Sequence, residues 1–173
     1  MLITKINTET PNKTNRRIVD TLYKVNNWTF GRDNKDSKYN INKCNAGLIY
    51  SSYIAEQNYV NHEVLNTHAV VILDTIESKS FLKYKKLMRV YWNWYAPGAL
   101  MEFHQDGNKD NYYSIIYNIH NNDGGTEFNI NNKIKFFKSV ESEALLFPSI
   151  LYHRGMAPKE SLNRFALNII VQI

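Results

Sequence analysis

The hydrophobic positions along the chain change their period near Leu82. Before that point, two stretches carry apolar residues three and four apart, the spacing of one face of an α-helix. The first stretch contains Ile18, Leu22 and Val25, with Asn15 as its expected N-cap. The second runs from Leu65 to Ser78 and has an apolar stripe of Leu65, Ala69, Ile72, Leu73 and Ile76. We expect both helices to pack on a core and the rest of the first half to be irregular.

After Leu82 the apolar and polar positions alternate in short runs separated by turn signals such as Pro97-Gly98 and Asp106-Gly107. This pattern predicts strands over Met88–Ala96, Leu100–His104, Tyr112–His120, Thr126–Ile130, Ile134–Ser139, Glu143–Phe147, Ile150–His153 and Arg164–Gln172. Many short, closely spaced strands favour an antiparallel sandwich, barrel or jelly roll. We therefore expect a mainly β (α+β) fold with N-terminal helices.

Three of these strands have one apolar and one polar face. In Arg164–Gln172, alternate positions give a face of Phe165, Leu167, Ile169 and Val171, and an opposite face that includes Arg164 and Asn168. Side chains alternate sides along a strand, so the two sets point in opposite directions. The polar faces either contact solvent or line a ligand cavity while the helices cover the apolar faces. The position of Arg164 between Leu162 and Phe165 favours the cavity.

Composition restricts the class of protein without naming a function. The chain has 173 residues, 43% of them hydrophobic, and a single cysteine, Cys44, which excludes an internal disulfide. Its length suits one domain, and no apolar run approaches the roughly 20 residues of a membrane-spanning helix. The net charge is +5, but the basic residues are scattered, which does not favour a nucleic-acid partner. We expect a cytoplasmic protein without a signal peptide or membrane segment.

His104 and Asp106 form a candidate metal-binding pair. Residues two apart on a strand point the same way, so the imidazole and the carboxylate can reach one ion. His153 follows on a later strand, and Arg164 stands eleven residues beyond it. Two histidines and one carboxylate form the facial triad of non-haem Fe(II) oxygenases. The other histidines, His62, His68 and His120, are interpreted as structural.

The stretch from Met88 to the C-terminus resembles the prolyl 4-hydroxylase-like branch of the Fe(II)/2-oxoglutarate-dependent dioxygenases. The matching residues are Tyr95-Ala-Pro97-Gly98, His104-Gln-Asp106, Ser114-Ile-Ile-Tyr-Asn118, Gly124-Gly125-Thr-Glu-Phe128, Glu143-Ala-Leu-Leu-Phe147, His153 and Arg164-Phe-Ala-Leu-Asn168. The resemblance implies a double-stranded β-helix, or jelly roll, backed by N-terminal helices. It implies one domain over residues 1–173, with helical support in 1–84 and the jelly-roll core in 85–173.

Carried over residue by residue, the resemblance assigns an Fe(II) site to His104, Asp106 and His153. Arg164 would bind the distal carboxylate of the cosubstrate 2-oxoglutarate, and a guanidinium fork suits that carboxylate. The remaining cosubstrate contacts would come from Tyr95, Asn118 and Asn168. The reaction with O₂ would give succinate and CO₂, with no catalytic residue beyond the metal ligands.

The substrate is left open. A protein side chain, with proline first, or a small metabolite would be hydroxylated, although the short Gly107–Asn111 link departs from many relatives that act on prolyl peptides. Substrate contacts are expected in the loops Gly31–Asn45, Gly107–Asn111 and Gly155–Asn163. A nucleic-acid-modifying oxygenase is less favoured, because relatives that demethylate nucleic acids have an extended arginine-rich signature after the last histidine, whereas Arg164-Phe-Ala-Leu-Asn168 contains one arginine. The non-enzyme alternative is a jelly-roll binding module without turnover.

Overall fold

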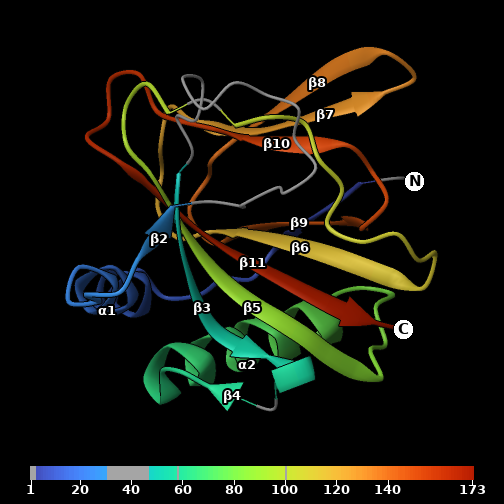
Figure 1. Cartoon of the computed structure of the whole chain (residues 1–173), viewed down its shortest axis with the longest axis horizontal. Helices are drawn as coiled ribbons and strands as arrows, with labels where there is room; N and C mark the ends of the chain where they lie inside the picture. Colours follow the sequence, from blue (N-terminus) through green and yellow to red (C-terminus); the bar gives the residue numbers. More distant parts are fainter. Residues whose placement is uncertain (1–2, 31–46, 58, 100) are drawn as a thin grey trace.

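The computed structural model describes residues 3–30, 47–57, 59–99 and 101–173. Within these residues it contains two helices, α1 (Asn12–Leu22) and α2 (Glu63–Ser78), and two sheets (Figure 1). The strands are β1 (Thr4–Asn7), β2 (Thr29–Phe30), β3 (Leu48–Ile54), β4 (Tyr59–Val60), β5 (Lys86–Tyr95), β6 (Tyr112–Asn118), β7 (Gly125–Ile130), β8 (Lys133–Lys138), β9 (Glu143–Pro148), β10 (His153–Met156) and β11 (Arg164–Gln172).

The major sheet has the order β1-β9-β6-β11-β5-β3-β2, with β4 paired to β3, and the minor sheet has the order β10-β7-β8. The pairings are antiparallel throughout. In Figure 1 the minor sheet lies across one face of the major sheet. The expected β-rich, jelly-roll class of fold is therefore confirmed.

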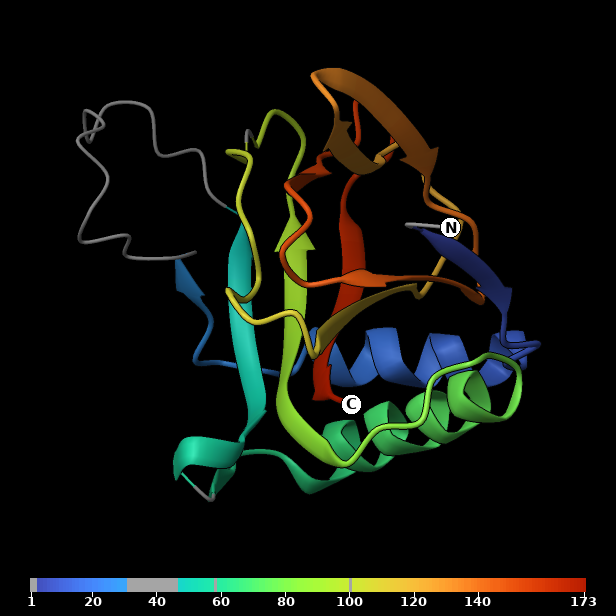
Figure 2. The ribbon, with the colours of Figure 1, turned by 90° about the vertical axis from the view of Figure 1, so that its right-hand side faces the viewer.

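The two helices lie next to each other on the other face of the major sheet (Figure 2). The predicted apolar stripe of α2 is buried throughout, and so is the apolar face of β11. These residues form one core between helices and sheet. A second, smaller apolar cluster fills part of the space between the two sheets; it includes Tyr95, Ile116, Phe128, Leu145 and Phe147. The polar face of β11 therefore points into the space between the sheets, as a ligand cavity requires.

The expected cap of the first helix is not found, and the second helix begins with a histidine cap. The prediction that Asn15 caps the first helix is wrong, because α1 begins at Asn12, after Pro11. Asn15 lies within α1 and is buried, where its amide donates to Ser142 Oγ at 3.0 Å and accepts from Tyr117 Oη at 2.6 Å. It therefore ties the helix to the major sheet. His62 caps α2, since its Nδ1 accepts the backbone N–H of Leu65 at 3.3 Å.

Three other expectations about secondary structure are wrong. The first half is not only helical or irregular, because β1 and β3 are part of the major sheet and β3 pairs with β5. Of the proposed strand Leu100–His104, the described residues retain only an isolated bridge between His104 and His153. The strand proposed over Ile150–His153 instead begins at His153, because a turn closed by the Leu151 N–H and the Pro148 carbonyl, 2.9 Å apart, precedes it.

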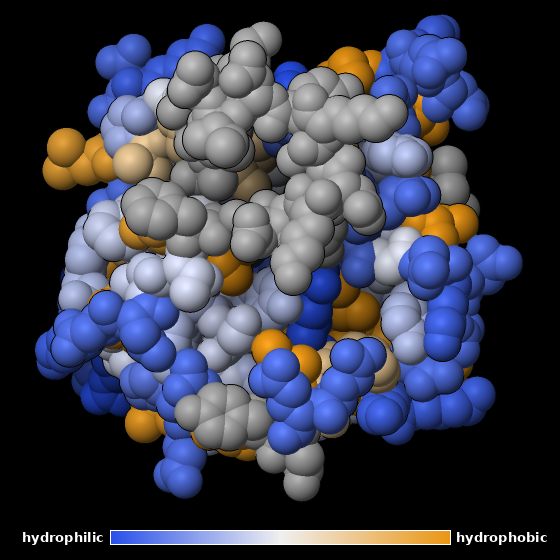
Figure 3. Space-filling model, viewed as in Figure 1, coloured by the Kyte–Doolittle hydropathy of each residue, from blue (hydrophilic) through white to orange (hydrophobic). Residues whose placement is uncertain are grey.

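The outer surface carries no sign of a membrane-crossing helix: among the described residues, neither helix combines the length and the apolar character needed to span a bilayer. On the face in Figure 3, apolar groups are scattered among hydrophilic ones. Exposed apolar side chains that are scattered in this way are normal on a protein surface. Cys44 and the whole of the loop Gly31–Asn45 lie outside the described residues.

Candidate metal centre

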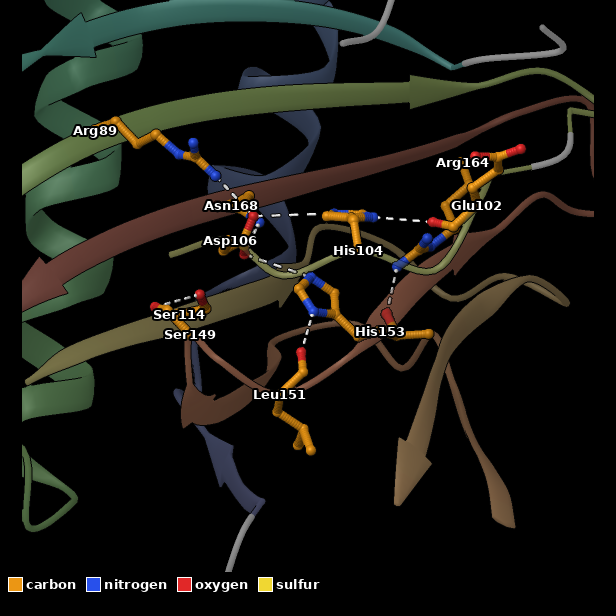
Figure 4. Close-up of polar contacts among 11 residues, drawn as sticks. Arg89, Glu102, His104, Asp106, Ser114, Ser149, Leu151, His153, Arg164 and Asn168 are labelled. Atoms are coloured by element: carbon orange, nitrogen blue, oxygen red, sulfur yellow. Dashed lines mark hydrogen bonds and ion pairs between the residues drawn. The ribbon is translucent and has the colours of Figure 1, made fainter. Parts of the chain in front are cut away.

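Three side chains of metal-ligand type meet between the two sheets. His104, Asp106 and His153 each offer one atom, and these atoms lie within 4.8 Å of one another. Nε2 of His153 is 3.4 Å from Asp106 Oδ2, and Nε2 of His104 is 3.9 Å from Asp106 Oδ1 (Figure 4). Metal–ligand bonds of about 2.1 Å place neighbouring ligand atoms roughly 3 Å apart. The spacing therefore suits one ion after a small inward movement.

The backbone brings the two histidines together. The N–H of His104 donates to the carbonyl of His153 at 2.9 Å, and the reverse bond has the same length. Nδ1 of His104 lies 3.0 Å from the Glu102 carbonyl, and Nδ1 of His153 lies 2.9 Å from the Leu151 carbonyl. A carbonyl oxygen can only accept, so we assign the proton of each neutral ring to Nδ1. Each Nε2 then has its lone pair directed to the candidate site.

The carboxylate of Asp106 is held on both oxygens. Its side chain is only 2% exposed, and Oδ1 accepts a bond from Arg89 Nη2 at 2.6 Å. Oδ2 accepts a bond from Asn168 Nδ2 at 3.0 Å. Burial by itself raises the pKa of Asp106, but the protonated form of His153, Arg89 and the protonated form of His104 together outweigh burial and hold the pKa well below its usual range. Asp106 is therefore an anion, the form that binds a metal ion.

Arg164 is a buried cation with unused donors. It is 1% exposed, and its Nε and Nη1 atoms have no hydrogen-bond partner. Its Nη2 atom lies 3.3 Å from Thr126 Oγ1 and 3.4 Å from Asn118 Oδ1, which are long bonds. Burial lowers the pKa of Arg164 and Tyr95 partly restores it, but an arginine stays charged in a protein. Unpaired buried donors are costly and indicate a missing anionic partner.

Tyr95 lies directly against this guanidinium. The Cζ atom of Arg164 is 4.9 Å from the centroid of the Tyr95 ring. Burial raises the pKa of Tyr95, so its hydroxyl stays protonated and can donate. Two glycines leave room for the ring: a Cβ on Gly47 would lie 2.8 Å from Tyr95 Cδ1, and a Cβ on Gly155 would lie 2.6 Å from the hydroxyl oxygen. Gly155, which lies in β10, therefore helps to position Tyr95.

Comparisons of sequence find nothing, whereas comparisons of structure find many similar chains. No protein-family model matches the sequence, and no curated protein is significantly similar to it. A prolyl 4-hydroxylase from Pseudomonas putida superposes with a TM-score of 0.71 at 12% identity, covering 99% of this chain and 92% of its own. A prolyl hydroxylase from Trichoplax adhaerens, in complex with a peptide fragment of hypoxia inducible factor, gives 0.71 at 15% identity and covers 98% and 83%.

A third similar structure is HygX from Streptomyces hygroscopicus with nickel and 2-oxoglutarate bound. It gives a TM-score of 0.66 at 8% identity and covers 98% of this chain and 82% of its own. The chain has the fold of the Fe(II)/2-oxoglutarate oxygenases. Within this oxygenase fold, the histidine–aspartate pair and His153 come together as the sequence predicted.

The structure also locates the other predicted site residues of the oxygenase fold. Asn118 lies beside Arg164, and Tyr95 lies against it. Asn168 faces the same space but bonds to Asp106 of the His104, Asp106 and His153 cluster. His120 is structural, as interpreted: its Nε2 accepts the backbone N–H of Phe165 at 3.0 Å.

Sequence reasoning missed two polar residues of this space, Arg89 and Thr126. Both had a usable signal. Arg89 precedes Tyr91, Asn93 and Tyr95 by even numbers of residues and so shares their face of β5. Thr126 stands inside the motif Gly124-Gly125-Thr-Glu-Phe128, which was noted only as a family match.

Proposed function

We propose that this chain is an Fe(II)- and 2-oxoglutarate-dependent dioxygenase that hydroxylates a protein side chain, with proline the first candidate, or a small metabolite. The observation that carries the proposal is one space between two sheets that holds both a two-histidine, one-carboxylate cluster and a buried arginine with unused donors. A metal site alone would allow many functions. The metal-ligand cluster together with the unpartnered donors of Arg164 favours a ligand that has a carboxylate and also reaches the metal.

The donor set fits a ferrous ion. Two imidazole nitrogens and one carboxylate oxygen leave open coordination positions, the arrangement of non-haem Fe(II) oxygenases. We assign the ligands as His104, Asp106 and His153. The rings of Phe147 and Phe128 lie 4.8 Å and 5.8 Å from the His153 ring, centroid to centroid, and keep water from that side.

The space beside the metal site fits 2-oxoglutarate. Arg164 would take its distal carboxylate through a planar fork in which Nη2 is paired with the free Nε or with the free Nη1. Tyr95 would donate one further hydrogen bond, and Asn118 would hold Arg164 in place. Asn168 would stay on Asp106 at the metal end. Fe(II), 2-oxoglutarate and O₂ would together supply the oxidising power for hydroxylation, with succinate and CO₂ as coproducts.

Two kinds of bound molecule bear on the substrate class. Among the similar structures, one prolyl hydroxylase is in complex with a peptide, and HygX has also been solved with hygromycin B. Proteins of this fold therefore bind both peptides and small molecules. We treat residues 1–173 as one oxygenase domain, because strands from both halves build the major sheet that carries the site.

The test is succinate formation by the protein loaded with Fe(II) under nitrogen and then supplied with 2-oxoglutarate and O₂. We expect succinate only when all three are present, and a loss of at least a hundredfold in Asp106→Ala and His153→Ala. His68→Ala, on α2 and outside the site, is the matched control and should keep wild-type turnover. Equal succinate from Asp106→Ala and wild type would show that the triad is not the site. A folded protein that binds Fe(II) and 2-oxoglutarate but forms no succinate would be a binding module.

A further inference from the structure

A second arginine, Arg89, flanks the candidate metal centre on the side away from Arg164 (Figure 4). The register of β5 and β11 fixes this placement: Tyr95 is opposite Arg164, whereas Arg89 is opposite Ile170. Arg89 and Tyr95 are six positions apart on the strand, so their backbone positions are about 20 Å apart at 3.3 Å per residue. Asp106, His104 and His153 lie between the two arginines. The two cations therefore cannot serve the same ligand group.

The guanidinium of Arg89 is held in place but not fully used. Its Cζ atom lies 4.6 Å from the centroid of the Tyr91 ring, so the ring supports one face of the group. Nη2 donates to Asp106, the one ion-pair partner of Arg89 among the described residues. Nε is buried and has no partner. Arg89 thus keeps donor capacity after its bond to Asp106 is made.

Charge balance indicates what would use this capacity. In the loaded site, a ferrous ion, the Asp106 carboxylate and the two arginines would together have three positive charges. The two carboxylates of 2-oxoglutarate would neutralise two of them. One positive charge remains, and Arg89, Asp106 and the ion share it at the metal end of the space, since Arg164 faces the cosubstrate. A singly charged carboxylate matches that surplus, whereas a doubly charged phosphate exceeds it.

We propose that Arg89 selects substrates that carry a carboxylate close to the carbon that is hydroxylated. This inference rests on the proposed function and names a substrate class for it. One oxygen atom of O₂ would enter the substrate C–H bond to give C–OH. The other would go to 2-oxoglutarate, which is oxidised to succinate and loses CO₂. The substrate carboxylate is unchanged in this balance and serves only to orient the substrate at Arg89.

Two sources of such a carboxylate can be told apart with matched probes. One set is the N-acetyl amino acids and their neutral amides, in which the carboxylate is terminal. The other is a set of capped tripeptides with aspartate or asparagine in the centre, in which it belongs to a side chain. Binding of each probe is measured by calorimetry on the anaerobic Fe(II)·2-oxoglutarate complex. We expect at least one acid to bind tenfold or more tightly than its neutral partner.

Variants then connect the preference to Arg89. Arg89→Gln should bring acid and amide to within about twofold of each other while 2-oxoglutarate binding is unchanged. If that variant no longer binds Fe(II), Tyr91→Leu decides, because it removes the support of Arg89 without touching Asp106. That variant should reduce the preference at least threefold. Arg16→Gln, on α1 and on the other side of the major sheet, is the control and should leave the preference unchanged.

Each failure has a distinct meaning. Equal affinity for acids and their neutral partners on a loaded wild-type protein, whether both bind or neither does, overturns the inference alone. The inference is also overturned if Arg89→Gln keeps the full preference for the acid over its neutral partner. If Arg89→Gln no longer binds Fe(II), the same result in Tyr91→Leu overturns it. A wild-type protein that binds neither Fe(II) nor 2-oxoglutarate overturns the proposed function, and this inference with it.

Discussion

Replacing Arg164 by methionine should raise the stability of the ligand-free protein while abolishing its response to 2-oxoglutarate. In the ligand-free state, Arg164 is a fully buried charge with two unpartnered donors. Each buried donor without a partner costs about 1–3 kcal/mol. Methionine removes that cost and fills the site with a flexible apolar chain of similar length.

The expected change in the free energy of unfolding is the balance of the interactions that the substitution removes. It relieves roughly 2–6 kcal/mol at the two free donors and loses the stacking on Tyr95, worth about 1–2 kcal/mol. It also loses two long bonds to Thr126 and Asn118. The net gain is about 1 kcal/mol, which corresponds to a Tm increase of roughly 2–4 °C for a domain of this size. An apolar replacement of a buried charge is often neutral or stabilising.

The assay is thermal unfolding of the Ni(II)-loaded protein with and without 2-oxoglutarate. At one hundred times its Kd, a ligand stabilises the native state by about 2.7 kcal/mol, so wild type should show a clear upward shift. Arg164→Met should show none at the same concentration. Arg16→Met, at an exposed position of α1, controls for the loss of a positive charge. The reasoning is refuted if Arg164→Met unfolds at a lower Tm than wild type, or if 2-oxoglutarate still stabilises it.

Three further predictions concern the surroundings of Arg164. Tyr95→Phe should raise the 2-oxoglutarate KM only about two- to tenfold, since one neutral hydrogen bond contributes about 0.5–1.5 kcal/mol. An unchanged KM would contradict a contact between Tyr95 and the cosubstrate. Gly155→Ala should raise the same KM by at least as much, because its Cβ would displace the Tyr95 hydroxyl, and wild-type kinetics would show that the ring is held by other contacts. Burial and Arg164 lower the pKa of His120 below 6.5. At a pH below 6.5 the unfolded chain therefore binds a proton at His120 more readily than the folded chain, and the stability of the fold should decrease as the pH falls. His120→Gln should flatten that dependence in chemical denaturation at pH 5–7.5, and an unaltered slope would assign it to other groups.

The part of the fold that sequence predicts best is the part with long, regular alternation. β11 has the predicted bounds, since every second residue from Phe165 to Val171 is apolar and buried. β3 was missed because Leu48–Ile54 has two serines inside an otherwise apolar run, so neither period is clear. Its place in the sheet comes from pairing with β5, a contact between residues about 40 positions apart.

The candidate site was predictable to the extent that it follows strand parity and spacing. His104 and Asp106 are two residues apart, and the sequence gives no reason to place them on an irregular segment held by one bridge to His153. The Asn15 error has a similar cause: a residue type that favours helix starts was kept inside α1 by buried bonds to Tyr117 and Ser142. Long-range hydrogen bonds of this kind leave no periodic signal in the chain.

The most direct test of the central claim is an anaerobic titration of the metal-free protein with Fe(II) and 2-oxoglutarate, followed by visible absorption. The account predicts a charge-transfer band that needs both components and saturates at one equivalent of Fe(II). The band should be absent in His153→Ala and present in His68→Ala. A folded wild-type protein that gives no band, or a band that survives in His153→Ala, would contradict the assignment of His104, Asp106 and His153 as the iron site.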